Sequence, residues 1–212
     1  MLLDLDGTLI DTVPDLAAAL NRLAHARGLA RFTPAETAAM VGDGVAKLVE
    51  RACAARGCRA DAADVAAFTA DYAAHAALAS RPYPGVAETL RWLTAEGWRL
   101  AVCTNKPAAP ARLLLAHLGV LPLLAAIGAG DSFPVKKPDP DHVRLTLREA
   151  GGDPGRSVMI GDHHNDVAAG QGAGLPTIFA AWGYGAPEMA AGADAVAESF
   201  AVVPALCERL RP

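Results

Sequence analysis

Residues 2–11 read LLDLDGTLID, and this stretch decides how the rest of the chain is interpreted. An apolar start typical of a buried β-strand leads into Asp4 and Asp6, and the turn-forming Gly7 follows. Two carboxylates at the end of one strand repel each other unless a cation lies beside them. The stretch therefore predicts a first strand whose end carries a chemical site. Only three residues precede Asp4, so this strand is expected to be short or to begin upstream.

The composition of the 212 residues, 52% of them hydrophobic, predicts a substantial buried core. The formal net charge of −4 argues against a general nucleic-acid-binding protein. No apolar run approaches the roughly 20 residues of a transmembrane helix, so we expect no membrane partner. No secretory signal is visible, and the spacing of the four cysteines matches no zinc or redox motif. We therefore expect free thiols and a cytoplasmic protein.

Short apolar runs alternate with amphipathic stretches over most of the chain. Strands are predicted within residues 1–5, 98–105, 123–130, 157–162 and 176–183, and helices within residues 85–97, 110–119, 139–152 and 164–174. This alternation predicts an α/β protein with a Rossmann-like, mostly parallel sheet covered by helices on both faces.

Residues 12 to about 80 interrupt that alternation. They contain four helical patterns, within residues 13–28, 33–42, 45–57 and 63–78, and no convincing strand. We therefore predict a helical cap of residues 12–81 inserted after the first strand. The catalytic core would then be discontinuous, with residues 1–11 and 82–212, and hinges would lie near residues 11–14 and 79–84.

Polar or charged side chains follow four of the predicted strands. Ligands of such sheets bind beyond the carboxyl ends of the strands, where parallel neighbours bring these groups together. The residues are Asp4 and Asp6 after the first strand, Thr104, Asn105 and Lys106 after the second, Lys136 and Lys137 after the third, and Asp162 and Asp166 after the fourth.

This set of side chains indicates phosphate chemistry. Oxygen ligands at a few positions, completed by water and phosphate, are what Mg²⁺ prefers, and lysines balance a dianionic substrate. A carboxylate facing phosphorus acts as a nucleophile and forms an acyl-phosphate. Of the 19 basic residues only four are lysines, and three of these lie in the predicted site. The adjacent Lys136 is expected to face solvent.

Each motif taken alone has a structural explanation. Asp6-Gly7 also fits a turn, and residues 104–107, 136–140 and 161–166 also fit a turn or a helix start. All four together, each after an apolar run, favour a common site. His163 and His164 are expected to cap a helix or line the site, because adjacent histidines seldom share one ion.

With these residues the chain resembles the haloacid dehalogenase superfamily of phosphohydrolases, and within it the phosphoglycolate phosphatases. The resemblance rests on DLDGTLIDT from residue 4, TN at residue 104, KKPDP around Lys137 and GDHHND at residues 161–166. It implies that Asp4 is the nucleophile, Asp6 the general acid/base and Lys137 the residue that stabilises both nucleophile and phosphate. It also implies that Thr104 and Asn105 bind phosphoryl oxygens. The implied Mg²⁺ ligands are Asp4, Asp6 through its carbonyl, and Asp162, with Asp166 acting through water.

Substrate choice is expected to lie in the cap. Residues 40–52 resemble a cap segment of phosphoglycolate phosphatases in which a Gly-x-Gly turn opens a helix. The free N–H groups after Gly44 suit the carboxylate of 2-phosphoglycolate, and Lys47 or Arg51 would add charge. Asp43 would repel that carboxylate unless it points away or caps the helix. WGYG at residues 182–185 is expected to form a loop beside the site.

These expectations lead to a Mg²⁺-dependent phosphatase that converts 2-phosphoglycolate and water into glycolate and phosphate. Lys106 is included among the predicted substrate-binding residues. The alternatives are a phosphatase for another small phosphate or pyrophosphate, a sugar-phosphate mutase, and a non-catalytic phosphometabolite-binding protein. Asp6 disfavours dehalogenation, which needs no second aspartate. The expected partner is a small phosphorylated metabolite, and the protein is expected to be a monomer or a homodimer.

Overall fold

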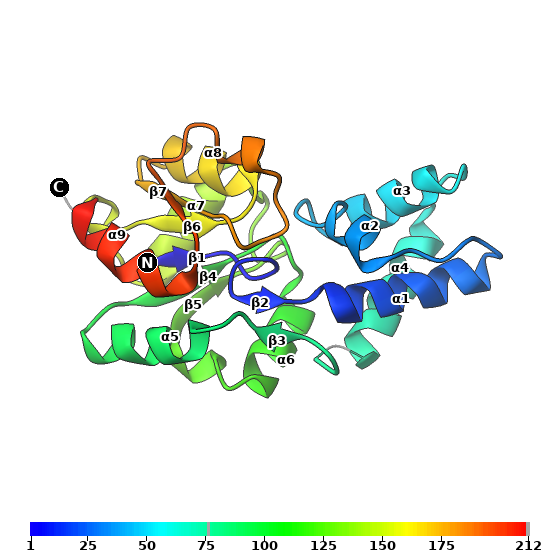
Figure 1. Cartoon of the computed structure of the whole chain (residues 1–212), viewed down its shortest axis with the longest axis horizontal. Coiled ribbons are helices and arrows are strands. Elements are labelled where there is room, and N and C mark those ends of the chain that lie inside the picture. The colour runs from blue at the N-terminus through cyan, green and yellow to red at the C-terminus, as the bar shows by residue number, and fades with distance from the viewer. Residues whose placement is uncertain (76, 211–212) are drawn as a thin grey trace.

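The computed structural model describes residues 1–75 and 77–210, and its centre is a six-stranded sheet (Figure 1). The strand order is β5-β4-β1-β6-β7-β8, and every paired neighbour is parallel. The strands are β1 (Leu2–Leu3), β4 (Leu100–Cys103), β5 (Leu124–Gly128), β6 (Met159–Gly161), β7 (Thr177–Ala180) and β8 (Ala195–Ala197). The predicted α/β class with a Rossmann-like parallel sheet is confirmed, whereas β8 was not predicted.

Helices cover both faces of the sheet because buried side chains alternate along its strands. Leu3, with Val102 and Ile160, packs in one cluster with α5 (Val86–Ala95), α6 (Ala108–His117) and α9 (Val203–Arg209). Leu2, with Ala101 and Met159, packs in another with α7 (Pro140–Glu149) and α8 (His164–Gly172). Short 3₁₀ turns occupy Leu121–Leu123, Pro154–Arg156, Pro187–Ala190 and Phe200–Val202.

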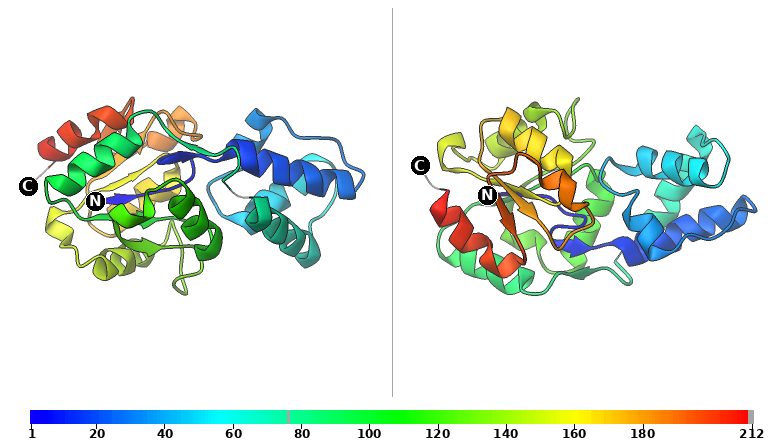
Figure 2. Two further views of the ribbon diagram at one scale, coloured as in Figure 1. Left: turned by 90° about the horizontal axis from the view of Figure 1, so that it is seen from below. Right: turned by 45° about the horizontal axis from the view of Figure 1, so that its top comes forward.

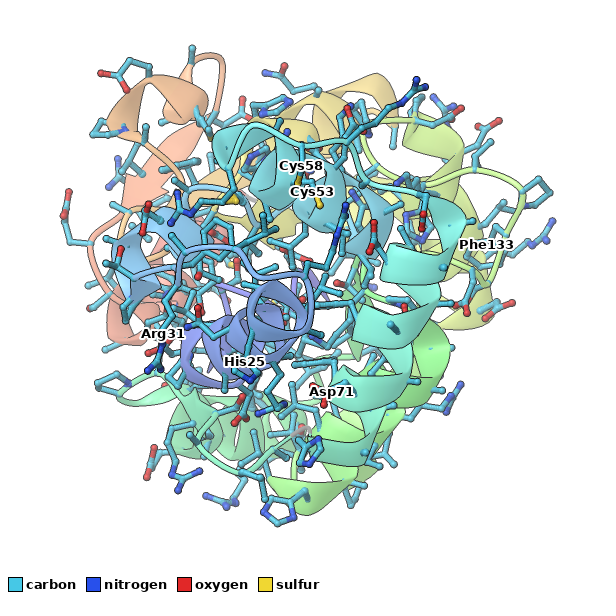
Figure 3. The ribbon with its side chains drawn as sticks, turned by 90° about the vertical axis from the view of Figure 1, so that its right-hand side faces the viewer. His25, Arg31, Cys53, Cys58, Asp71 and Phe133 are labelled. Atoms are coloured by element: carbon cyan, nitrogen blue, oxygen red, sulfur yellow. The ribbon has the colours of Figure 1, made fainter. Side chains whose placement is uncertain are left out.

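A block of four helices lies beyond one end of the sheet (Figures 1 and 2). It contains α1 (Val13–Ala26), α2 (Pro34–Ala38), α3 (Val45–Ala55) and α4 (Ala62–His75). The four helical patterns are therefore confirmed, although α4 ends at His75 and residue 76 of the predicted segment lies outside the described residues. The block has a hydrophobic cluster of its own, with buried residues between Leu16 and Tyr72. Figure 3 looks onto this block, where Cys53 and Cys58 lie close together.

Two short strands join the block to the sheet. Strand β2 (Ile10–Asp11) pairs antiparallel with β3 (Arg81–Pro82), so the outgoing and returning chain are hydrogen-bonded to each other. This pairing supports the division into a core of residues 1–11 and 82–212 and a cap of residues 12–81, which stays a prediction.

Asp15 stabilises the same junction by hydrogen bonds to the returning chain. Its buried carboxylate accepts hydrogen bonds from the backbone N–H groups of Ala79 and Ser80, both at 2.9 Å, and from the Ser80 hydroxyl at 2.6 Å. The first turn of α1 is thereby held against the returning chain. A helix N-terminus also favours a carboxylate in its first turn.

We expect Asp15→Ala to lower the free energy of unfolding by about 3 kcal/mol, because three donors, the two of Ser80 buried, lose a charged acceptor. Urea denaturation measures this change. Asp141→Ala is the matched control: its exposed carboxylate pairs only with Arg144 on the same helix, so the loss should stay within about 0.5 kcal/mol. Equal losses in the two variants would contradict the role of Asp15.

Candidate active site

The two aspartates of the opening motif lie at the centre of the sheet edge. Strand β1 lies between β4 and β6, so Asp4 and Asp6 emerge where residues from both neighbours also end. Asp4 is buried, and its Oδ1 lies 2.8 Å from Nζ of Lys137. Asp6 is partly exposed and contacts Lys106. The two carboxylates therefore have different partners.

Lys137 is the buried cation of this edge. Its Nζ donates to Oδ1 of Asp166 and to the carbonyl oxygen of Cys103, both at 2.5 Å, and it also contacts Asp4. Two of the three ammonium donors are therefore used in hydrogen bonds, and the Asp4 contact is an ion pair. Burial alone would lower the pKa of Lys137, but the charges of Asp166 and Asp4 outweigh it and raise that pKa. Lys137 is therefore charged.

Asp162 is held in place from two sides. The Thr8 hydroxyl donates to its Oδ1 at 2.7 Å, and the Tyr184 N–H donates to its Oδ2 at 2.8 Å. Gly7 has φ +88°, and a Cβ there would lie 2.3 Å from Asp162 Oδ2, so the turn after β1 needs glycine for two reasons. Asp166 accepts from the His163 N–H at 3.0 Å in addition to Lys137.

Three buried carboxylates, those of Asp4, Asp162 and Asp166, each place an oxygen within 4.8 Å of the others. Burial and the Asp4 charge raise the pKa of Asp162 to about 7. The pKa of Asp166 is raised to about 8, mainly by burial, although Lys137 lowers it. With Lys137 as the one cation in contact with them, the three carboxylates keep two formal negative charges. This donor set fits a hard divalent cation with oxygen ligands.

Asp6 belongs to a second polar group that reaches the cap. Nζ of Lys106 lies 2.9 and 3.2 Å from the two carboxylate oxygens of Asp6 and 2.8 Å from the hydroxyl of Tyr72 on α4. The same ammonium lies 4.4 Å from the centre of the Tyr72 ring. Burial would lower the pKa of Lys106, but the adjacent Asp6 raises it, so this lysine is charged. A cap side chain therefore positions a cation at the core site.

A cavity between the sheet edge and the helical block joins these groups. Thr104 and Asn105, as predicted, lie in it beside Lys106. The Asn105 side-chain NH₂ donates to the carbonyl oxygens of Gly42 at 3.1 Å and Lys137 at 3.0 Å. The lining consists of Asp4, Asp6, Leu16, Val41, Gly42, Gly44, Val45, Leu48, Tyr72, Thr104, Asn105, Lys106 and Pro110.

The predicted cap residues fall in different places. Gly44 lines the cavity directly before α3. Lys47 forms an ion pair with Glu50 at 2.9 Å and is not among the residues that line this cavity. Arg51 pairs with Asp43 and donates to the Met40 carbonyl oxygen at 3.0 Å. Asp43 is thereby neutralised within the cap.

Comparison with known proteins assigns the family. The family model for haloacid dehalogenase-like hydrolases matches residues 1–174. The chain belongs to this family. A phosphoglycolate phosphatase from Agrobacterium fabrum is 42% identical over 98% of this chain and 91% of its own length. A phosphoglycolate phosphatase from Caulobacter vibrioides is 40% identical over 96% of this chain and 88% of its own length.

Solved structures show the same relationship. A predicted phosphoglycolate phosphatase from Haemophilus somnus has a TM-score of 0.88 and 28% identity, covering 97% of this chain and 96% of its own. The protein CbbY from Rhodobacter sphaeroides, solved with phosphate and as a mutant with xylulose-1,5-bisphosphate, has a TM-score of 0.80 and 30% identity. The match covers 94% of this chain and 93% of CbbY.

Several residues of this hydrolase site were not found from the sequence. Thr8 and Tyr184 position Asp162, and Tyr72 contacts Lys106. Tyr184 also donates from its hydroxyl to Oδ1 of Asp11 at 2.7 Å, and Trp182 donates to the Thr8 carbonyl oxygen at 3.0 Å. The predicted loop of residues 182–185 therefore does lie beside the site. Tyr72 had no sequence signal, because it occupies an ordinary apolar position of a cap helix.

The raised pKa values predict a pH-dependent effect of Mg²⁺. The cation-free fold binds more protons than the unfolded chain between about pH 4 and 8, because the Asp162 pKa is about 7 and the Asp166 pKa about 8. That contribution to stability is lost as the pH rises through these values. Of these two carboxylates Asp162 is the expected direct ligand, and Mg²⁺ competes with its proton, so the apparent Mg²⁺ affinity should be about tenfold tighter at pH 8 than at pH 6.

The measurement is the Mg²⁺-induced rise in melting temperature at several pH values. Burial lowers the pKa values of the Met1 amino group, His142 and His163, so these groups make stability rise with pH. Their contribution is the same with and without Mg²⁺ and cancels when the two melting temperatures at each pH are subtracted. Asp162→Asn should remove most of the effect. A rise in melting temperature that does not depend on pH would contradict this assignment.

Proposed function

We propose that this hydrolase is a Mg²⁺-dependent phosphatase acting on 2-phosphoglycolate through an aspartyl-phosphate. The observation that carries the proposal is the position of Asp4, which contacts Lys137 and belongs to the three-carboxylate cluster, at the wall of the cavity. The phosphoglycolate phosphatase names of relatives about 40% identical over nearly the whole chain support the substrate.

In the proposed first step, a carboxylate oxygen of Asp4 attacks phosphorus and the bond between phosphorus and the glycolate oxygen breaks. Asp6 gives its proton to the departing alkoxide, so glycolate leaves as an alcohol. In the second step a water molecule attacks phosphorus, Asp6 takes a proton from that water, and the bond to Asp4 breaks. Phosphate is released and both aspartates return to their starting states.

The residues around Asp4 assist the reaction by stabilising charge and by positioning the phosphoryl group. Lys137 contacts Asp4 directly and stabilises it as an anion between turnovers. Thr104 would donate to a phosphoryl oxygen through its hydroxyl and Asn105 through its backbone N–H, because the Asn105 side-chain NH₂ already donates to Gly42 and Lys137. Mg²⁺ would be held by the carboxylates of Asp4 and Asp162 and by the Asp6 carbonyl, with Asp166 supporting it through water. When bound, the ion neutralises the developing negative charge on the phosphoryl group.

Lys106 is the residue we assign to the substrate carboxylate. Among the described residues that line the cavity it is the single cation, since Lys47 and Arg51 are not part of the lining. Gly44 and Val45, at the start of α3, line the same cavity, and the free N–H groups of a helix start favour an anion. A substrate with a phosphate and a carboxylate close together matches this arrangement.

Other small phosphate esters, pyrophosphate and a mutase reaction on sugar phosphates are the alternatives in the same chemistry. The CbbY complex with xylulose-1,5-bisphosphate makes sugar bisphosphates the first of them to test. A non-catalytic phosphometabolite-binding protein is the alternative outside enzymes. The absence of disulfides among the described residues agrees with the proposed cytoplasmic location, and a monomer or homodimer stays the expected assembly.

Asp4→Asn should reduce phosphate release from 2-phosphoglycolate by at least about a thousandfold, because the attacking oxygen is lost. Release is measured with and without Mg²⁺, beside a panel of xylulose-1,5-bisphosphate, other sugar phosphates, nucleotides and pyrophosphate. Asp141→Asn, at an exposed position, is the control and should keep full activity.

Equal turnover across the panel would leave the mechanism in place and overturn the substrate. Interconversion of a sugar phosphate without release would identify a mutase. A folded protein that binds Mg²⁺ and releases phosphate from nothing would be a binding protein, which contradicts the proposal.

Tyr72→Phe should raise the KM for 2-phosphoglycolate about fivefold and change kcat little. The substitution removes one hydrogen bond to Lys106, of about 1 kcal/mol, and keeps the aromatic ring. Steady-state kinetics with ethyl phosphate, which lacks the carboxylate, provide the comparison, and its KM should stay the same. An equal rise for both esters would show that Tyr72 does not act through carboxylate recognition.

A further inference from the structure

A second group of metal-ligating side chains lies where the cap meets the core. Asp43 comes from the loop before α3, and His163 and His164 stand at the start of α8. One ligand atom from each of the three lies within 4.8 Å of the other two. The catalytic carboxylates are not part of this group, so it is a separate candidate site.

His163 has an unused ligand atom. Its side chain is buried, with 7% exposure, and its Nδ1 has no hydrogen-bond partner. A buried polar atom without a partner costs roughly 1–3 kcal/mol, which a bound ligand would recover. Gly42 packs on the ring so closely that a Cβ there would lie 2.8 Å from its Cδ2. The ring is therefore fixed in position by the cap loop.

The backbone brings the two neighbouring histidines to the same side. His163 is extended, with φ −128° and ψ 154°, and the helix begins at His164. This change of direction places the ring centroids 4.2 Å apart, with a tilt of 47°. The objection that adjacent histidines seldom share an ion therefore does not hold for this pair, because the third donor and the local backbone were not visible in the sequence.

Asp43 has one carboxylate oxygen available. Oδ2 pairs with Arg51, whereas Oδ1 receives a long hydrogen bond of 3.3 Å from Asn165. The loop itself is held on the core, since Asn105 and Asn165 both donate to the Gly42 carbonyl oxygen. Lys136 donates to the carbonyl oxygen of Asp43 at 2.8 Å. The carboxylate is thereby presented to the two imidazoles.

We propose that Asp43, His163 and His164 bind a divalent transition-metal ion such as Zn²⁺, and that this ion fastens the cap to the core. Two imidazoles and one carboxylate suit Zn²⁺, Co²⁺ or Ni²⁺, whereas Mg²⁺ requires oxygen ligands. The substrate cavity lies between the two parts that the ion would join, so the bound ion hinders substrate entry and product release. The binding claim is independent of the proposed function, and only the inhibition rests on it.

Equilibrium dialysis of the full chain against Zn²⁺ in a large excess of Mg²⁺ tests the binding. We expect one Zn²⁺ per chain and a loss of affinity of at least about tenfold in His164→Asn and in Asp43→Asn. His164 is exposed, so its replacement should leave the unfolding curve unchanged. His117→Asn, at an exposed position on α6, is the matched control and should bind Zn²⁺ like the unaltered chain. Co²⁺ should give visible absorption bands that His164→Asn removes.

Phosphate release at fixed Mg²⁺ tests the consequence. Zn²⁺ should inhibit the unaltered chain and His117→Asn, and inhibit His164→Asn at least about tenfold less strongly. Equal Zn²⁺ affinity in the unaltered chain and His164→Asn would overturn the site. Inhibition relieved by added Mg²⁺ would place Zn²⁺ at the catalytic carboxylates and overturn the fastening role. A chain that releases no phosphate would refute the proposed function, while dialysis would still decide the site.

Discussion

The burial of several carboxylates around one lysine is the constraint on which the site depends. Asp4, Asp162 and Asp166 are taken out of water at one sheet edge, and burial of this kind is unfavourable unless the charges are paired. Lys137 forms ion pairs with two of them, Asp4 and Asp166, and donates to the carbonyl oxygen of Cys103 at the end of β4. The remaining negative charge supports the proposal that a divalent cation, and with it a phosphate, binds at this edge.

The parallel sheet is what brings these groups together. Because β1 is central and its neighbours β4 and β6 run in the same direction, polar residues 100 to 160 positions apart end at one edge. The cap completes the site from the other side, through Tyr72 on Lys106 and through the loop of Gly42 and Asp43. The proposed reactive groups therefore come from the core, whereas the cavity walls that would select a substrate come from both the core and the cap.

Sequence reasoning succeeded where local pattern and chemistry agree. The motifs after the first four core strands contain every residue of the catalytic cluster, and the interruption of the strand–helix alternation located the helical block. The sequence did not predict features that depend on short elements or on residues far apart in the chain. Strand β8 (Ala195–Ala197) is three residues long and half exposed, which is too little for a periodic pattern. The pairing of β2 with β3 joins residues that are about 70 positions apart.

The sequence by itself determined the fold class, the order of the motifs and the candidate reactive groups, because strand ends and carboxylate spacing can be read from consecutive residues. Only the tertiary structure decided which charges are already paired. Lys47 and Arg51 pair with the cap carboxylates of Glu50 and Asp43, whereas Lys106 pairs with Asp6 at the wall of the cavity, although all three residues are basic in the sequence. The free energy of a charge depends on its burial and its partners, and both are properties of the folded chain.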